Sequence, residues 1–399
     1  MPRPAMILPA LVLLAAALNC GAASGTHTAP RPRARDLGVP FDGTPGPLNA
    51  ITDVAGVLVG HTTRIEGNGK LVVGKGPIRT GVTAVLPRAA ASLMQNFSFA
   101  GWYAQNGNGE MTGTIWVEES GFLEGPVMIT NTHSVGVVRD AVIAWRVAHG
   151  PADATDSWWS LPVVAETWDG WLNDINGFHV KPEHVFHAID SASSGPVAEG
   201  SVGGGTGMIC NGFKGGIGTS SRRLPDKAGG YTVGVLVQCN IGGMGHSLRI
   251  AGVPVGREIV GNDPYNPELP DFSERGSIIA VVATDAPLLP HQLKRIARRV
   301  SLGLGRTGSI AANDSGDIFI AFSTANTGAS VVDHVVALKM LPNDMMSPLF
   351  AATVQATEEA VVNAMVAATD MTGVDGHQVR ALPHDQLRAV LAKYHRLVH

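Results

Sequence analysis

The stretches Ser277-Ile-Ile-Ala-Val-Val-Ala-Thr284 and Asp317-Ile-Phe-Ile-Ala-Phe322 decide the fold class of this chain. Both are continuous apolar runs rich in β-branched or aromatic residues, which is typical of strands buried on both faces. Between them apolar residues recur at helical spacing, and we expect one helix from about Leu289 until Gly303 and Gly305 end it. The order strand, helix, strand predicts a mixed α/β fold in which helices cover sheets.

The same β–α–β unit brings polar side chains together. If the two strands run parallel in one sheet, the crossover helix returns the chain so that both strands start at the same edge. Ser277 would then lie near Ser315 and Asp317, which stand just before and at the start of the second strand. We interpret a serine beside a second serine and a carboxylate as a candidate site.

Elsewhere, short β-type runs alternate with glycine-rich turns. We expect strands at residues 56–60, 81–86, 112–117, 126–130, 162–166 and 231–240, and helices at 135–145, about 347–368 and about 384–397. Glycine is densest over residues 200–221. This region completes neither GxGxxG nor GxxxxGK[ST], so tight turns between strands explain it better than a nucleotide-binding loop.

Composition excludes several classes of protein. The chain has 399 residues, of which 45% are hydrophobic and 16% charged, and this argues against a disordered protein, a coiled coil or a collagen-like repeat. Lys and Arg total 29 against 33 Asp and Glu, a net charge of −4 without a basic block. Nucleic acid is not an expected partner, because phosphate binding needs a clustered positive field.

The N-terminus is typical of a secretory signal. Arg3 precedes an apolar run over residues 6–18, and small residues follow around residues 21–23. This run is too short to span a membrane, and no later segment is long and apolar enough to do so. We expect a signal peptide over residues 1–23, a polar linker over 24–40 and a periplasmic or secreted protein. Cys20 could carry a lipid anchor, but Leu18 and Asn19 before it fit a lipidation site poorly, so this alternative is less favoured.

Export would leave two cysteines, Cys210 and Cys239, each in an apolar or glycine-rich strand-like run. They could pair in an oxidising compartment, or they could be two buried thiols, and the sequence leaves both open. Neither lies in a CxxC motif or at a Cys/His metal-ligand spacing.

Three other features are candidate chemical groups. His184 and His187 lie three residues apart, a spacing that more often marks an ordinary amphipathic helix than a pair of metal ligands. His133 follows a strand and could serve as a catalytic base, although a loop or capping role is favoured. Glu166 ends an apolar strand, where a buried carboxylate needs a cation. That cation could be a substrate ammonium or a structural salt-bridge partner.

Several co-ordered motifs resemble the DmpA-type aminopeptidases, the family of L-aminopeptidase/D-esterase-amidases and β-peptidyl aminopeptidases. The resemblance covers residues from about 35 to the C-terminus. Its motifs are Ala165-Glu-Thr-Trp-Asp-Gly170, Leu172-Asn-Asp-Ile-Asn176, Val202-Gly-Gly-Gly-Thr-Gly-Met208, Lys214-Gly-Gly-Ile-Gly-Thr-Ser-Ser-Arg222, Gly276-Ser-Ile-Ile279, Ala283-Thr-Asp-Ala-Pro-Leu-Leu-Pro290 and Ser315-Gly-Asp-Ile-Phe319.

The resemblance implies a precursor that cuts its own chain between Gly276 and Ser277. A single catalytic domain over residues 41–399 would then consist of an α-chain (about 24–276) and a β-chain (277–399). The freed Ser277 would carry a hydroxyl nucleophile and an α-amine that can accept its proton near neutral pH. The family fold is an α/β (α+β) layered αββα sandwich, in which two mixed sheets lie between helices. Such proteins are usually oligomers of processed heterodimers, and neither a cofactor nor a metal is expected.

Further roles transfer by position. Ser315 and Asp317 match the family's pair beside the nucleophile, and Asn240 matches the side-chain donor to the tetrahedral oxyanion. Glu166 matches the acidic residue that holds the substrate ammonium. Trp168 stands where some members have tyrosine, so a role in shaping the pocket is expected rather than a hydroxyl contact.

The resemblance thus implies a serine aminopeptidase or amidase. It would release small N-terminal α- or β-amino acids from peptides, amides or esters through an acyl-enzyme on Ser277. Two alternatives remain open. One is an unprocessed serine hydrolase that uses His133, and the other is an exported binding protein of the same fold without catalysis.

Overall fold

The computed structural model describes residues 31–150, 159–241, 245–260 and 276–398. The chain divides into Met1–Arg31 and Pro32–His399, and the fold below is that of the second unit. The predicted signal peptide over residues 1–23 lies outside the described residues. Within them, no helix is both long and apolar enough to cross a membrane.

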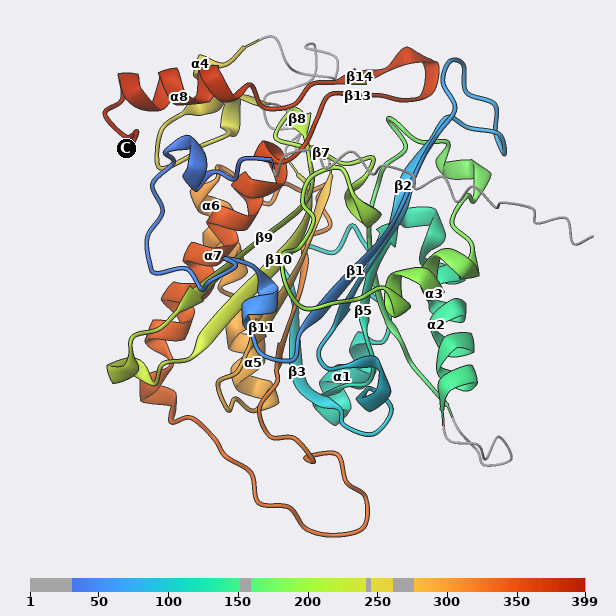
Figure 1. Cartoon of the computed structure of the whole chain (residues 1–399), viewed down its shortest axis with the longest axis vertical. Coiled ribbons are helices and arrows are strands. Elements are labelled where there is room, and N and C mark those ends of the chain that lie inside the picture. Colours follow the sequence, from blue (N-terminus) through green and yellow to red (C-terminus); the bar gives the residue numbers. More distant parts are fainter. Residues whose placement is uncertain (1–30, 151–158, 242–244, 261–275, 399) are drawn as a thin grey trace, which may run out of the picture. The chain divides into compact units, whose positions relative to one another are not determined.

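The larger sheet has six strands and includes the two runs that predicted the fold class (Figure 1). Its strands, in spatial order, are β4 (Phe122–Leu123), β3 (Ser98–Ala104), β12 (Ile318–Ser323), β11 (Ser277–Thr284), β10 (Thr232–Asn240) and β9 (Gly216–Arg223). Strands β11 and β12 run parallel, with Ile279 opposite Ile318, and all other neighbours are antiparallel. The predicted parallel pair is confirmed.

The smaller sheet has four strands, and it contains a second parallel pair. Its spatial order is β1 (Leu58–Glu66), β2 (Ile78–Leu86), β5 (Val127–Asn131) and β6 (Val163–Thr167). Strands β5 and β6 are parallel and are connected through α2 (Val135–His149), whereas the other neighbours are antiparallel. The ends of β5 and β6 therefore lie side by side.

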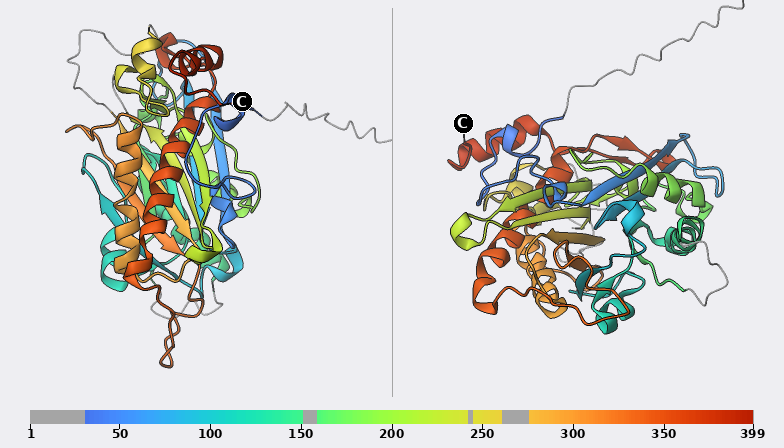
Figure 2. Two further views of the ribbon diagram at one scale, coloured as in Figure 1. Left: turned by 90° about the vertical axis from the view of Figure 1, so that its left-hand side faces the viewer. Right: turned by 60° about the horizontal axis from the view of Figure 1, so that its bottom comes forward.

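Burial on both faces of β11 explains the layering. Ile279 and Val281 pack against the other sheet, whereas Ile278 and Ala280 pack against helices. The helices on that side are α5 (Pro290–Ala297), α6 (Val300–Arg306) and α7 (Ser347–Val366). Helices α2 and α3 (Pro182–Asp190) cover the smaller sheet (Figure 2). The layers run helix, sheet, sheet, helix, as expected.

Two predicted elements were wrong. The single helix expected from Leu289 is divided into α5 and α6, and Gly303 lies inside α6 rather than after its end. A Cβ atom on Gly303 would lie 2.5 Å from the Cβ of Thr357, so glycine lets α6 approach α7 closely. The strand expected at residues 112–117 is replaced by the helix α1 (Thr114–Ser120), which left-handed Gly113 and Gly121 bound.

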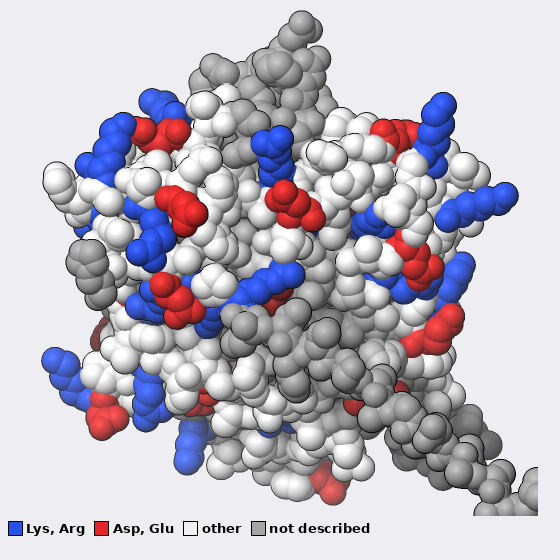
Figure 3. Space-filling model, turned by 45° about the horizontal axis from the view of Figure 1, so that its top comes forward, with Lys and Arg blue, Asp and Glu red and all other residues white. Residues whose placement is uncertain are grey.

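Smaller elements complete the fold. They are the hairpin β7 (Ile209–Cys210) and β8 (Phe213–Lys214), the hairpin β13 (Met371–Thr372) and β14 (Gln378–Val379), α4 (Val255–Glu258) and α8 (His384–Lys393). On the face drawn in Figure 3, basic and acidic side chains of the described residues are interspersed rather than separated by sign.

Residues 33–39 pack on the body of the fold, although they belong to the segment expected to be a linker. Arg33 forms an ion pair with Glu199 at 2.8 Å, and Arg35 forms one with Glu359 at 2.8 Å. Glu359 also pairs with Arg222 at 2.7 Å. The segment is therefore attached through carboxylates that lie inside the protein.

Candidate active site

Ser277 is the first residue of β11, at the edge where β11 and β12 both start. Its side chain is buried, and its β10 neighbour across the ladder is Asn240. Gly276 has a φ of +129°, and a Cβ there would overlap the Asn240 backbone oxygen. The backbone just before Ser277 thus has a conformation and a clearance that only glycine fits.

The expected approach of Ser277 to the start of β12 is confirmed. Gly276 forms a parallel bridge with Ser315, and the Gly316 N–H donates to Ser277 Oγ at 3.2 Å. The Ser315 hydroxyl donates to Asp317 Oδ1 at 2.6 Å, and both residues are fully buried. A buried hydroxyl–carboxylate pair therefore flanks Gly316, whose N–H contacts Ser277 Oγ.

The Asn240 side chain has a defined orientation. Its Oδ1 accepts from the Ile209 N–H at 2.8 Å, and its Nδ2 donates to the Trp168 carbonyl oxygen at 2.9 Å. A donor on one side and an acceptor on the other determine which end of the amide is nitrogen. Nδ2 carries a second N–H besides the one that donates to Trp168, and Asn240 lines the same cavity as Ser277.

Glu166 lies near the end of β6 and is buried. One oxygen accepts from the Glu110 N–H at 3.0 Å, and the other accepts a short hydrogen bond from the Thr132 hydroxyl. Burial raises the pKa of this carboxyl, although these hydrogen bonds act in the opposite direction. Within the described part of the chain no ion pair involves Glu166, so no cationic side chain there acts as the structural salt-bridge partner.

Several of these candidate site residues line one cavity of about 860 Å³. Ser277, Asn240, Glu166 and Trp168 all line it, whereas Ser315 and Asp317 are buried and are not among its described lining residues. Its lining includes the carboxylates of Glu110, Glu166 and Asp314, and no lysine or arginine among the described residues. Such a cavity suits a ligand with a positive charge.

Sequence reasoning missed two contributors, Glu110 and Thr132. Both donate to Glu166, and both lie outside the regular strands, at positions that hydrophobic periodicity does not predict. The polar Asn-Thr-His run after β5 was the available signal for Thr132, but only its histidine is an obvious chemical candidate.

His133 lies away from the nucleophile's contacts. It belongs to a 3₁₀ turn (Thr132–Ser134), and its backbone N–H donates to Asn131 Oδ1 at 3.0 Å. The imidazole stacks near Phe178, with ring centres 6.2 Å apart. Among the described residues no hydrogen bond joins His133 to Ser277, and His133 does not line the cavity. The geometry therefore gives the His133-dependent alternative no support.

His184 and His187 lie on the amphipathic helix α3, as expected. His184 Nε2 is 2.6 Å from Arg64 Nη1, and His187 Nδ1 is 3.1 Å from Thr62 Oγ1. In the ranges that the structure describes, no group of three or more His, Cys, Asp or Glu side chains is arranged to hold a metal ion.

Known proteins resemble this chain over nearly all of its length. The model of peptidase family S58 matches residues 49–379. The β-peptidyl aminopeptidase BapA of Sphingosinicella microcystinivorans is 56% identical over 96% of this chain and 97% of its own length. BapA of Sphingosinicella xenopeptidilytica is 49% identical over 96% of each chain.

Solved structures agree with this assignment. The L-aminopeptidase D-Ala-esterase/amidase of Ochrobactrum anthropi, a variant of the Ntn-hydrolase fold, superimposes with a TM-score of 0.85 at 49% identity, covering 92% of this chain and 100% of that one. A Burkholderia sp. β-aminopeptidase gives 0.81 at 49% identity, covering 90% and 98%. Sequence, fold and site therefore lead to one conclusion: the chain belongs to peptidase family S58 and is an aminopeptidase with the Ntn-hydrolase fold.

Proposed function

We propose that the chain is made as an inactive precursor, that it cuts its own Gly276–Ser277 bond, and that the freed Ser277 is the nucleophile. The left-handed Gly276 backbone supports this, because an N-to-O acyl shift needs an unhindered and strained peptide before the serine. In that shift Ser277 Oγ attacks the Gly276 carbonyl carbon, the C–N bond breaks, and water hydrolyses the resulting ester. The products are a Gly276 carboxylate and a free Ser277 amine.

In turnover, the Ser277 α-amine takes the hydroxyl proton as Oγ attacks the substrate carbonyl. Asn240 Nδ2 donates to the oxyanion, a contribution worth about 2.7–4 kcal/mol. The proton passes to the leaving amine or alcohol, and water then releases the amino acid from the acyl-enzyme. The hydrogen-bonded pair of Ser315 and Asp317 orients the nucleophile and stabilises the ammonium that forms beside it.

Glu166 restricts the enzyme to chain ends by binding the substrate's free ammonium. The observation that carries this assignment is a buried carboxylate with only neutral donors, in the same cavity as Ser277. Trp168 and Trp171 line the same cavity. Together with the names of the relatives, this favours release of small N-terminal β- or α-amino acids from peptides, amides or esters.

The remaining expectations are part of the same proposal. The predicted signal peptide supports export to the periplasm or beyond, where the enzyme would act on small peptides. Neither a nucleic acid partner nor a membrane span is part of the proposal.

A homo-oligomer of processed heterodimers is proposed as well. In its support, the loop between β12 and α7 projects from the body and exposes Val332 by 100% and Val335 by 98%. A second copy would bury such a surface.

Intact mass and N-terminal sequencing of the purified protein test the proposal, with Ser277→Ala as the control. We expect two chains from the wild type, one starting at Ser277, and a single inactive chain from the variant. Glycine and β-alanine amides should be hydrolysed, whereas their N-acetylated forms should not. An uncut wild-type chain that hydrolyses amides would overturn the precursor mechanism. Hydrolysis of the acetylated amides would overturn the role of Glu166.

A further inference from the structure

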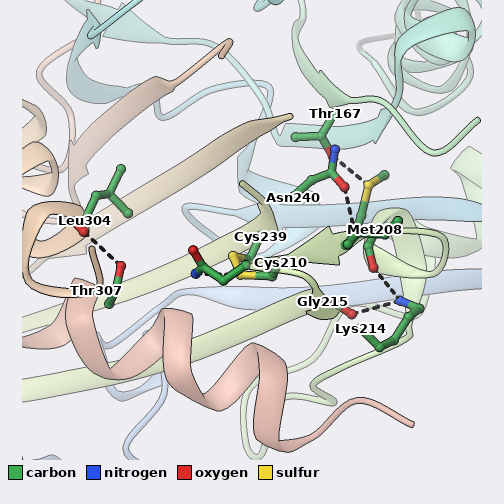
Figure 4. Close-up of a disulfide and its surroundings, with 11 residues drawn as sticks. Thr167, Met208, Cys210, Lys214, Gly215, Cys239, Asn240, Leu304 and Thr307 are labelled. Carbon is green, nitrogen blue, oxygen red and sulfur yellow. Dashed lines mark hydrogen bonds between the residues drawn. A yellow bond between two sulfur atoms is a disulfide. The ribbon is translucent and has the colours of Figure 1, made fainter. Parts of the chain in front are cut away.

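A disulfide joins Cys210 and Cys239, whose Cα atoms are 5.6 Å apart (Figure 4). The sequence left both pairing and two buried thiols open, and the structure pairs the cysteines in a buried position. Cys239 directly precedes Asn240 in β10, and Cys210 directly follows Ile209 in β7. The covalent link thus connects the same two backbone segments that meet in the hydrogen bond from Ile209 N–H to Asn240 Oδ1.

The orientation of the Asn240 amide depends on that hydrogen bond. If the amide turned by 180°, its nitrogen would face the Ile209 N–H and its oxygen would face the Trp168 carbonyl. A donor would then face a donor at Ile209, and an acceptor would face an acceptor at Trp168, so neither hydrogen bond could form. The Ile209 N–H and the Trp168 carbonyl together select the native orientation, and loss of the Ile209 N–H would leave the Trp168 carbonyl alone to hold it.

The segment that carries Ile209 has little sheet structure of its own. Strands β7 and β8 pair only with each other, over two residues each, and so short a ribbon is marginal by itself. Lys214 Nζ helps to close the ribbon by donating to the carbonyls of Met208 and Gly215, both at 2.9 Å. Those bonds lie within the hairpin. Besides the disulfide, two hydrogen bonds attach the hairpin to β10 and to Ile241, the residue that follows β10. The Ile209 N–H donates to Asn240 Oδ1, and the Asn211 N–H donates to the Ile241 carbonyl.

We propose that the Cys210–Cys239 disulfide positions the Asn240 amide, holding the Ile209 N–H against Oδ1 so that Nδ2 points at the reacting carbonyl. The inference rests on the proposed role of Asn240 as the oxyanion donor. It assigns the cysteines an effect on the rate of acylation, beyond the stabilisation that any cross-link provides. Both are positioning residues, since neither lines the cavity.

Steady-state kinetics of three variants test this, namely Cys210→Ala/Cys239→Ala, Asn240→Ala and the combination. Rates are expressed per Ser277 N-terminus. The cysteine pair should lower kcat by about 10-fold or more at unchanged KM, because small displacements of a catalytic group are costly. Asn240→Ala should lower kcat about 10²–10³-fold. The combined variant should be no slower than Asn240→Ala, because the cysteines act through that residue.

Other outcomes are distinguishable. Wild-type kcat in the cysteine variant, or losses that multiply in the combined variant, would overturn the positioning role. Unchanged kcat in Asn240→Ala would overturn the oxyanion assignment itself, and this inference with it. Val235→Ala is the matched control, because Val235 is buried in β10 against the same core as Cys239. It should lower stability without lowering kcat.

A second test uses the matured wild-type enzyme, so that its result does not depend on any defect that the variants have in folding or self-cleavage. Wild-type protein exported through an oxidising compartment should show no reactive thiol when denatured without reductant, and two reactive thiols would overturn the inference. Reduction of the matured enzyme in subdenaturing urea should lower kcat relative to urea alone, and reoxidation should restore it. Unchanged kcat after two thiols have formed would also overturn it.

Discussion

At the residue scale, the cost of burying a charge makes Glu166 a sensitive test of the site. Its carboxylate has only neutral partners in the described structure, so a substrate ammonium would be its ionic partner. Glu166→Gln should raise KM for substrates with a free amine about 10- to 100-fold, the value of a charged hydrogen bond. Kinetics on glycine and β-alanine amides measure this. Glu183→Gln, on the exposed start of α3, is the control and should leave KM unchanged.

The same burial predicts a pH dependence. Because burial raises the pKa of Glu166, this carboxyl takes up its proton at a higher pH than an exposed glutamate does. Ammonium binding is complete above the raised pKa and is lost as the pH falls through it. KM should therefore increase from neutral to acidic pH in the wild type, and the increase should be absent in Glu166→Gln. Identical pH profiles of KM for the two proteins would contradict this.

Gly276→Ala should leave the precursor uncut. The new Cβ would meet the Asn240 backbone oxygen, and a left-handed alanine adds about 1–3 kcal/mol of strain. Denaturing gels follow the two products over time. Gly252→Ala is the matched control, because Gly252 also has a positive φ, of +81°, and a Cβ added there would have nothing within 4 Å. Normal cleavage of both variants would show that clearance at Gly276 is not required.

His133→Ala separates the proposed mechanism from a histidine-dependent one. The imidazole makes no hydrogen bond to Ser277 in the described structure, so kcat should stay within about twofold, as for an ordinary surface substitution. Assays on matured protein measure this directly. Loss of all hydrolysis, with the variant still folded and cleaved, would restore His133 as the base.

Residues differed in how far the sequence could predict them. The approach of Ser277 to Ser315 followed from topology alone, because a parallel β–α–β unit must bring two strand starts together. Thr132 and Glu110 could not be found in that way. Their positions depend on loop paths, which tertiary packing sets and local periodicity does not encode.

At the scale of elements, strong periodic segments were predicted and boundaries were not. The strands near residues 277–284 and 317–322 and the helix starting near Ser347 match β11, β12 and α7. The break between α5 and α6 was missed because apolar spacing continues across it. Gly303 serves contact with another helix, a reason that is invisible in the local sequence.

Gly303→Ala should destabilise the protein by about 1–3 kcal/mol, because its Cβ would overpack against Thr357 on α7. Gly305→Ala is two residues away in the same helix, with nothing within 4 Å of its Cβ, and should stabilise by up to about 1 kcal/mol. Urea unfolding of the two variants gives both differences. Equal effects would mean that close packing of α6 on α7 does not explain Gly303.

At the scale of the whole molecule, the sheet would hold the two proposed chains together after cleavage. Strand β11 of the β-chain pairs with β10 of the α-chain, and β12 pairs with β3. Cutting before Ser277 would free an amine at the strand edge without removing either ladder. An N-terminal nucleophile built on a sheet can therefore be generated late, after the site around it has formed.

The anchored N-terminal segment supplies the prediction at this scale. A chain starting at residue 41 would lack Arg33 and Arg35, which pair with the Glu199 side chain (7% exposed) and the Glu359 side chain (0% exposed). Both arginines are partly exposed and Glu359 keeps its pair with Arg222, so the loss should cost less than the roughly 3–5 kcal/mol of a fully buried pair. The shorter chain should still be less stable than one starting at residue 32. Urea unfolding compares the two, and Arg33→Gln/Arg35→Gln separates lost charge from lost packing.

The pH dependence of that difference identifies the ionic part. Burial opposes ionisation of Glu359, but the hydrogen bond from Arg35 and the charge of Arg222 lower its pKa overall. A lowered folded-state pKa contributes stability above the unfolded pKa and loses it as the pH falls through the folded value. The stability gap between the two chains should therefore narrow in acid. Equal stability at neutral pH would instead mean that residues 32–40 behave as the linker that their composition suggested.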